Sequence, residues 1–152
     1  GWLGHKPWAA IHFNWVLRKV KYMGPNNENP ADPAAAGSHQ QVPPAEYEKN
    51  LRKLVARLQE TGATLIWCST TPVPEGANGR IAGDAVEYNE IAAKVMEENY
   101  IAVDDLYTFA KPRLKEIQLP ANVHFSKPGS KALAEQVAGS IEKALEKRGK
   151  SR

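Results

Sequence analysis

Apolar residues recur at helical spacing in three long segments of the chain. Residues 44–61 begin with a proline in the first turn and are followed by Gly62, which is the arrangement expected of helix termini. Residues 84–99 and 127–148 show the same periodicity, and Ser126 precedes the last segment as an expected helix cap. The sequence therefore predicts helices over these three segments.

Each predicted helix has one apolar face that a protein core would cover. The apolar positions of the first helix are Tyr47, Leu51, Leu54, Val55 and Leu58. Those of the second are Val86, Ile91, Ala92, Val95 and Met96. Those of the third are Ala132, Leu133, Val137, Ala138, Ile141 and Leu145. We expect these faces to pack inward while the charged residues between them stay in solvent.

Three short, mostly apolar runs have the length and composition of buried strands. They are residues 8–14, which end at Asn14, residues 63–68, and residues 100–103, which are followed by Asp104. Strands and helices alternate along the chain with short connections. This order predicts an α/β fold in which a parallel sheet is covered by helices on both faces.

Two segments are less regular. Residues 24–44 are rich in Pro, Asn and Ala and contain almost no large apolar side chains, so they predict an unusually long loop that is functional or mobile. We expect His39 in this loop to be solvated. A helical stretch begins at Leu106, is bent or restarted by Pro112, and runs on to Ile117.

Polar residues follow each predicted strand. In parallel sheets, ligands bind at the carboxyl ends of the strands, and Asn14, Ser69–Thr71 and Asp104 all fall at that edge. His124 lies in a short loop directly before the last helix, so we expect it at the same edge. A histidine held at a fixed position between a loop and a packed helix can serve as a general base, and a loop histidine without a task is the alternative.

With these positions in place, the chain resembles the SGNH hydrolases, the GDSL-type esterases and lipases that have a flavodoxin-like sheet. The resemblance extends from Trp8 to Leu145. It rests on four motifs in order: His12-Phe13-Asn14-Trp15, Ser69-Thr70-Thr71-Pro72-Val73-Pro74, Tyr88-Asn89, and Asn122-Val123-His124-Phe125-Ser126 with Gly129. It implies a three-layer α/β fold with a parallel sheet between two layers of helices, and it implies ester hydrolysis without a cofactor.

The resemblance also implies roles for two residues. Asn14 matches the family asparagine whose side chain donates a hydrogen bond to the developing oxyanion, and a preorganised donor at a strand end suits that task. The alternative for Asn14 is a turn residue that ends the strand. His124 matches the family's histidine base.

Several family features are absent from this sequence. No Gly-Asp-Ser turn supplies a nucleophile, and the block with the second oxyanion donor has no counterpart, so the chain resembles a carboxy-terminal portion that lacks the first strand–helix units. Ala121 stands where the family has an aspartate three residues before the histidine. The neighbouring Asn122 can orient an imidazole, but it cannot stabilise an imidazolium as a carboxylate does.

Three other residues are candidate nucleophiles, and each has a structural explanation. Ser69 at a strand end fits a turn residue, and Ser126 fits the helix cap. Cys68 belongs to a buried strand and has no cationic neighbour in sequence that would lower its thiol pKa. We assign the nucleophile to none of them.

Length, charge and residue spacing limit the domain organisation and the classes of ligand that the chain could bind. We place one domain at residues 1–148 and a short basic tail at 149–152. The net charge of +3 is modest, and the basic residues near the end alternate with Glu142 and Glu146, which favours a solvated helix end over a nucleic-acid site. The histidines and carboxylates lack the spacing of metal ligands. No membrane-spanning run or signal peptide is visible, and the compartment is undetermined.

The function expected from these features is an SGNH-type ester hydrolase acting on carboxyl or acetyl esters, or a fragment of one. The substrate would be a small-molecule ester. The alternative is a non-catalytic protein on the same scaffold that binds a ligand or partner. Because residues 9–13 would form a sheet edge without a protective charge or proline, we also expect self-association through this edge.

Overall fold

A computed structural model of the chain describes residues 21–27 and 31–150. The strand expected over residues 8–14, including Asn14, lies outside the described residues. All three expected long helices are present. They are α2 (Pro44–Gln59), α3 (Asp84–Glu98) and α6 (Lys127–Lys150).

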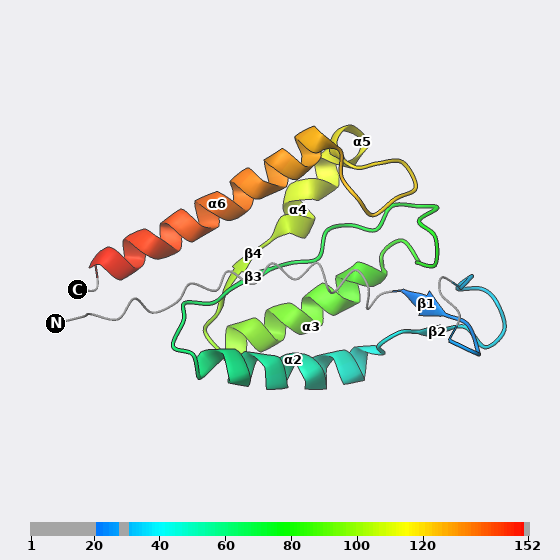
Figure 1. The fold of residues 1–152 in the computed structure, drawn as a ribbon, viewed down its shortest axis with the longest axis horizontal. Coiled ribbons are helices and arrows are strands. Elements are labelled where there is room, and N and C mark those ends of the chain that lie inside the picture. The colour runs from blue at the N-terminus through cyan, green and yellow to red at the C-terminus, as the bar shows by residue number, and fades with distance from the viewer. Residues whose placement is uncertain (1–20, 28–30, 151–152) are drawn as a thin grey trace.

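The two other expected strands form a parallel pair. β3 (Ile66–Cys68) pairs with β4 (Ala102–Asp104), and Cys68 lies opposite Asp104 in the register. Figure 1 shows this pair between α2 and α3 below and α4 and α6 above. The described chain is therefore a mixed α/β structure in which helices pack near a small sheet.

The bend expected at Pro112 is confirmed. Three short elements follow β4 in succession: α4 (Leu106–Ala110), a 3₁₀ turn η1 (Lys111–Arg113) that contains the proline, and α5 (Leu114–Ile117). Proline lacks an N–H donor and disfavours a continuous helix, so the chain changes direction at η1.

The segment expected as a long loop, residues 24–44, contains one short strand, which corrects that expectation. This strand, β2 (His39–Gln40), pairs in antiparallel fashion with β1 (Tyr22–Met23), which directly precedes the segment. The Tyr22 N–H donates to the Gly79 carbonyl at 2.8 Å, which attaches this pair to the segment after β3. His39 is exposed, as expected. Two-residue strands are held by a few backbone bonds and leave no hydrophobic period in the sequence.

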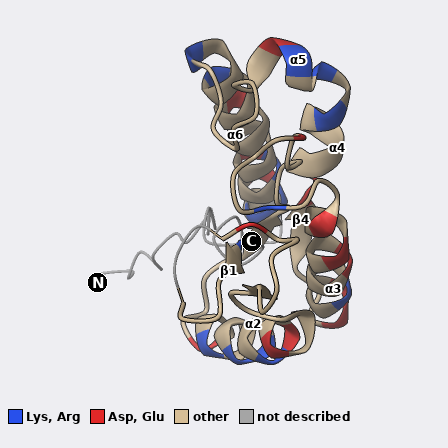
Figure 2. Ribbon diagram, turned by 90° about the vertical axis from the view of Figure 1, so that its right-hand side faces the viewer, with Lys and Arg blue, Asp and Glu red and all other residues tan. Residues whose placement is uncertain are grey.

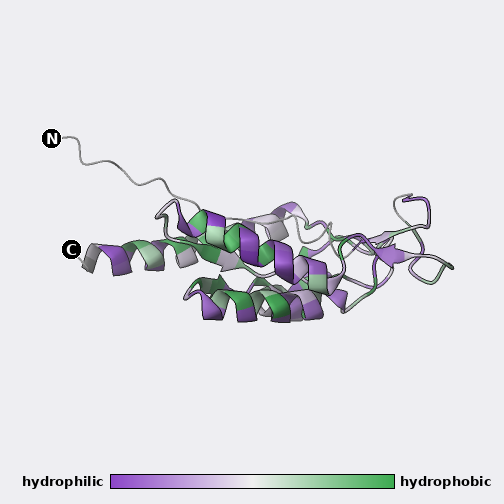
Figure 3. Cartoon of the chain, turned by 90° about the horizontal axis from the view of Figure 1, so that it is seen from below, coloured by the Kyte–Doolittle hydropathy of each residue, from purple (hydrophilic) through white to green (hydrophobic). Residues whose placement is uncertain are grey.

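The main hydrophobic core lies between β3, α2 and α3. Its members include Tyr47, Leu51, Val55, Trp67, Tyr88, Ala92, Val95 and Met96. Figure 3 shows hydrophobic and hydrophilic sectors on the helices, as expected for helices that cover a core on one side. The expected inner face of α2 is therefore largely confirmed.

One residue of the α3 face was assigned wrongly. Val86 was expected inside, but it is 38% exposed, whereas Tyr88 is fully buried. The Tyr88 hydroxyl donates to the Val42 carbonyl at 2.6 Å, which allows a tyrosine to occupy the core without leaving its polar atom unsatisfied. The helix consequently turns Tyr88 inward and places Val86 toward solvent.

α6 differs from the other long helices in its burial. None of the described side chains at positions 130–149 is buried. The helix extends to Lys150, two residues past the boundary expected for the basic tail, so this part of the chain is helical. Figure 2 shows Lys and Arg lying among Asp and Glu on α2 and α6, as expected for solvated helix surfaces.

We predict that Tyr88→Phe destabilises the protein by about 1–3 kcal/mol, because the buried Val42 carbonyl loses its donor. Tyr100→Phe is the matched control: Tyr100 is 98% exposed, and its change should stay within about 0.5 kcal/mol. Urea denaturation of both variants measures the difference. Equal midpoints would show that the buried hydroxyl adds nothing to stability.

Candidate functional site

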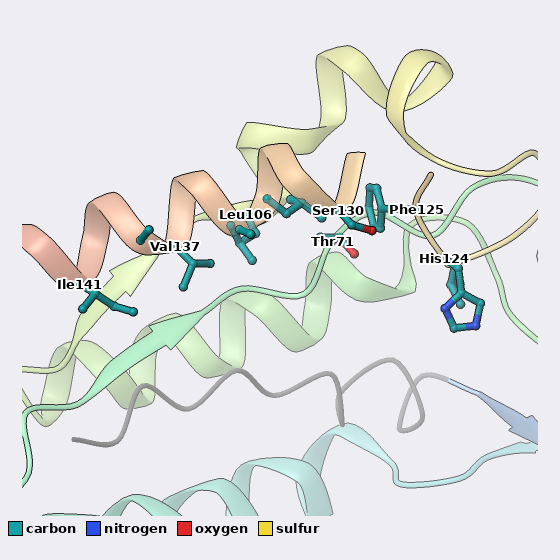
Figure 4. Close-up of a pocket in the computed structure, with 11 residues that line it drawn as sticks. Thr71, Leu106, His124, Phe125, Ser130, Val137 and Ile141 are labelled. Atoms are coloured by element: carbon teal, nitrogen blue, oxygen red, sulfur yellow. The ribbon is translucent and has the colours of Figure 1, made fainter. Parts of the chain in front are cut away.

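An apolar groove runs along α6 and ends at the turn that carries His124. Its volume is about 480 Å³. It is lined by Thr71, Leu106, Val123, His124, Phe125, Ser130, Leu133, Ala134, Val137, Ala138 and Ile141. Figure 4 shows Val137 and Ile141 pointing from α6 toward the strand below, with His124 at the far end of the groove. The groove thus combines a long apolar wall with a few polar groups at one end.

Backbone hydrogen bonds hold the His124 turn. The Leu119 N–H donates to the His124 carbonyl at 3.0 Å, and Gln118 and Phe125 form an antiparallel bridge. The Asn122 side-chain oxygen accepts from the His124 backbone N–H at 3.0 Å. Asn122 was expected to orient the imidazole, but its oxygen instead fixes the backbone of the turn. It therefore positions His124 through the main chain.

Two amide side chains connect this turn and α3 to the segment that leaves β3. The buried Gln118 side chain donates through Nε2 to the Pro72 carbonyl at 3.1 Å. Asn89 accepts from the Thr70 N–H and donates to the Thr70 carbonyl, both at 2.8 Å. Asn89 thus satisfies both backbone groups of Thr70, as a neighbouring strand would, and holds the backbone next to Thr71 in place. No role was predicted for either amide. The sequence did contain one signal for Asn89, because it belongs to the Tyr88-Asn89 motif on α3.

The beginning of α6 matches the prediction. The Ser126 hydroxyl accepts from the Gly129 N–H at 3.2 Å, as a helix cap does, and donates to the Ile117 carbonyl at 3.1 Å. Gly129 lies directly against Ile117, and a Cβ built on Gly129 would come 2.8 Å from the Ile117 Cβ. Only a glycine lets α6 begin this close to α5.

The Ser69 hydroxyl is occupied by structural hydrogen bonds. It donates to Asp105 Oδ1 at 3.0 Å and accepts from the Tyr107 N–H at 2.9 Å. Burial opposes ionisation of Asp105, but hydrogen bonds from Thr108, Ser69 and Tyr107 outweigh it and lower the pKa of this carboxyl. Ser69 therefore supports the start of α4. It lines a separate groove of about 240 Å³ together with Asn89 and Asp105.

Cys68 is a poor nucleophile in this fold. Burial, reinforced by the nearby Asp104 carboxylate, raises the pKa of its thiol to about 11. The thiolate, which is the reactive form, is therefore scarce at neutral pH. The interpretation of Cys68 as a structural residue agrees with this environment.

The expected convergence of polar groups on one rim is only partly found. Thr71 and His124 line the same groove. Ser69 lines the other groove, and Asp104 is buried, where it accepts from Gln136 Nε2 at 2.9 Å. Ser69, Thr71 and Asp104 do lie at or just after the ends of β3 and β4, but the position of a strand end does not determine which face each side chain occupies.

His124 itself is exposed, and within the described residues no hydrogen bond joins its ring to a serine or carboxylate.

A search of the described residues finds no group of three or more His, Cys, Asp or Glu side chains that could hold a metal ion. None of the described helices is long and apolar enough to span a membrane.

The fold of the chain is similar to those of solved structures, of which two are described here. One is the lipase/acylhydrolase from Enterococcus faecalis, with a TM-score of 0.61 and 19% sequence identity over 69% of this chain and 54% of that chain. The fold is hydrolase-like. The other is LAE5, an alpha/beta hydrolase enzyme from the metagenome of Lake Arreo, Spain, with a TM-score of 0.53 and 21% identity over 62% of this chain and 45% of that chain.

No protein-family model and no curated protein sequence matches the chain. The chain spans about half the length of the two similar structures. At these identities, the likeness establishes a shared hydrolase-like α/β fold.

We predict that Gly129→Ala destabilises the protein by about 1–3 kcal/mol and shifts the NMR signals of His124, because the new methyl group forces α6 away from Ile117. Gly139→Ala is the control within the same helix. Nothing lies within 4 Å of its added Cβ, so it should stabilise the helix by about 0.5–1 kcal/mol. Denaturant titration and ¹H–¹⁵N spectra measure both effects. Similar behaviour of the two variants would contradict the close approach.

Proposed function

We propose that this chain is an SGNH-type ester hydrolase, or a portion of one, that acts on carboxyl or acetyl esters. The observation that carries the proposal is the His124 turn at the end of an apolar groove, on a fold similar to a lipase/acylhydrolase. The proposal includes the three-layer flavodoxin-like sheet of that family. It needs no cofactor.

The proposed reaction is acyl transfer to water through a serine ester. A serine that no motif of this sequence identifies would attack the ester carbonyl while His124 accepts its proton, and the Asn14 side chain donates to the oxyanion that forms. The alcohol leaves after His124 returns the proton to it, and water then releases the acid by the same steps. Asn122 contributes by holding the backbone N–H of His124.

A second candidate function is non-catalytic binding on the same scaffold. The observation that favours it is the environment of the two candidate serines, because the hydroxyl groups of Ser69 and Ser126 are both held in structural hydrogen bonds. Within the described residues, no serine hydroxyl bonds to the His124 ring. A protein of this kind would bind a small ester-like ligand or a partner in the groove.

We predict that the 152-residue chain hydrolyses p-nitrophenyl acetate no faster than free imidazole, because loss of the nucleophile removes most of the rate of triad enzymes. Initial rates of the chain and of its His124→Ala variant measure this. Robust turnover that His124→Ala abolishes would mean that a serine of this chain is the nucleophile.

The hydrolase proposal itself is tested on the whole protein encoded by the reading frame that contains this chain. His124→Ala should lower kcat/KM for p-nitrophenyl acetate by about 10²–10⁴-fold, the usual contribution of a general base. His39→Ala is the matched control, because His39 is an exposed histidine in β2, and its activity should not change. If the unsubstituted product is inactive, the binding function is favoured instead.

We also propose that the chain associates with itself through residues 9–13. This run has no lysine, glutamate or proline to protect a sheet edge. Light scattering should therefore detect dimers or larger species, and Ile11→Lys should shift the protein toward monomer. Leu3→Lys adds the same charge outside the run and should have little effect. A clean monomer in the unsubstituted protein would argue for a covered edge.

A further inference from the structure

A second groove lies on the face of the β3–β4 pair that α3 covers. Its volume is about 240 Å³, and its lining includes Trp67 and Val103, which are register partners in the two strands. Val86 of α3 belongs to the same lining. Val86 is 38% exposed and Val103 is 44% exposed, whereas Trp67 is buried. The groove therefore has an apolar interior whose rim is open to solvent.

The groove adjoins an open edge of the sheet. Within the described residues, this sheet contains β3 and β4 alone, so the side of β4 away from β3 has no strand partner there. Ala102 is exposed, and β4 has no lysine or proline of the kind that protects an edge. Such an edge can pair with an extended peptide through backbone hydrogen bonds, while alternate side chains of the peptide enter pockets beside it. Val103 belongs both to this edge strand and to the groove.

Carboxylates give this surface a negative charge. Glu90 and Asp105 line the groove. The Asp105 Oδ1 accepts from the Ser69 hydroxyl at 3.0 Å and from the Thr108 N–H at 3.1 Å, so this carboxylate is held in place. Figure 2 shows the acidic side chains of α3. The helix has five of them, against Lys94 alone: Asp84, Glu87, Glu90, Glu97 and Glu98. A basic partner therefore complements this surface.

One lysine of the chain also lies at this groove. The Lys111 ammonium is 5.4 Å from the centroid of the Tyr107 ring, and Tyr107 is part of the lining. Aromatic rings attract ammonium groups at this distance. A single positive charge does not balance Glu90, Asp105 and the other acidic residues of α3, so the surface stays acidic.

We propose that this groove and the edge of β4 bind an extended, basic peptide segment of another protein. The peptide adds a strand to the sheet beside β4. One of its apolar side chains enters the groove against Val86 and Val103. Lysine or arginine side chains two residues before and after it point to the same face and approach Glu90 and Asp105. This binding does not depend on the proposed ester hydrolysis, because His124 lines the other groove.

Two other occupants fit these features less well. A free organic amine would satisfy the carboxylates, but it would leave the edge of β4 unpaired. A second copy of the chain would pair through the same edge by two-fold symmetry. Such a pair would bring the acidic α3 helices of both copies together, and like charges across an interface oppose association. The peptide alone uses the edge, the apolar walls and the charge together.

The first experiment titrates the ¹⁵N-labelled 152-residue chain with the peptide acetyl-Lys-Thr-Val-Thr-Lys-amide. The proposal expects saturable shifts of the amide signals of Ala102, Val103 and Glu90. The acidic peptide acetyl-Glu-Thr-Val-Thr-Glu-amide should bind about tenfold more weakly or worse, because its carboxylates meet those of the groove. Butylammonium chloride is the probe for a free cation. The proposal is overturned if the basic peptide causes no shifts, or if butylammonium causes equal shifts at equal concentration. Concentration-dependent shifts of the same signals without peptide would overturn it in favour of a second copy.

The second experiment tests the backbone pairing. Successive residues of a strand direct their N–H groups to opposite sides, so only alternate amides of the peptide meet β4. Two versions of the basic peptide are therefore compared, one N-methylated at its valine and the other at the threonine that follows. One version should lose binding and the other should keep it. Equal binding of the two, whether kept or lost, would rule out strand addition.

The third experiment tests the role of the carboxylates. Glu90→Lys should weaken binding of the basic peptide by about three- to tenfold and should strengthen binding of the acidic peptide. Glu142→Lys is the matched control, because it makes the same charge change at an exposed position of α6 outside this groove. It should leave the affinity of both peptides nearly unchanged. The same loss of affinity in the two variants would mean that only net charge matters, which contradicts the proposal.

Discussion

The site depends on the seam between the segment that leaves β3 and the turn that enters α6. Gln118 spans this seam, because its side chain donates to the Pro72 carbonyl while its backbone pairs with Phe125. Gly129 completes the junction by letting α6 begin directly against Ile117. These contacts hold the His124 turn beside Thr71, and both residues line the same groove.

Side-chain burial differs between the two sides of the β3–β4 pair, and this difference determines where the core and the groove lie. On one side, α2 and α3 bury large side chains and satisfy polar atoms such as the Tyr88 hydroxyl. On the other side, α6 contacts α4, α5 and β3 and donates from Gln136 to Asp104, but none of its described side chains from position 130 to 149 is buried. The buried core therefore lies on the α2 and α3 side of the strand pair, and the groove with His124 lies on the α6 side.

The sequence predicted what depends on long hydrophobic periods and on helix ends. α2, α3 and α6 were found from their apolar spacing, and the Ser126 cap and the Pro112 bend were found from local backbone chemistry. It did not predict the β1–β2 pair, because a few backbone bonds define such short strands. It also placed Val86 on the inner face of α3 and did not place Tyr88 there, since the sequence does not reveal the distant Val42 carbonyl that accepts the Tyr88 hydroxyl.

The candidate site was harder to predict than the fold, because strand ends fix position but not the direction of side chains. Ser69 and Thr71 are two residues apart, yet Ser69 lines the groove with Asn89 and Asp105 while Thr71 lines the groove with His124. This division restricts any ester chemistry. Ser69 and His124 line different grooves, so Ser69 is not the partner of His124 in the proposed reaction. The nucleophile of that reaction would have to lie on the groove that α6 lines.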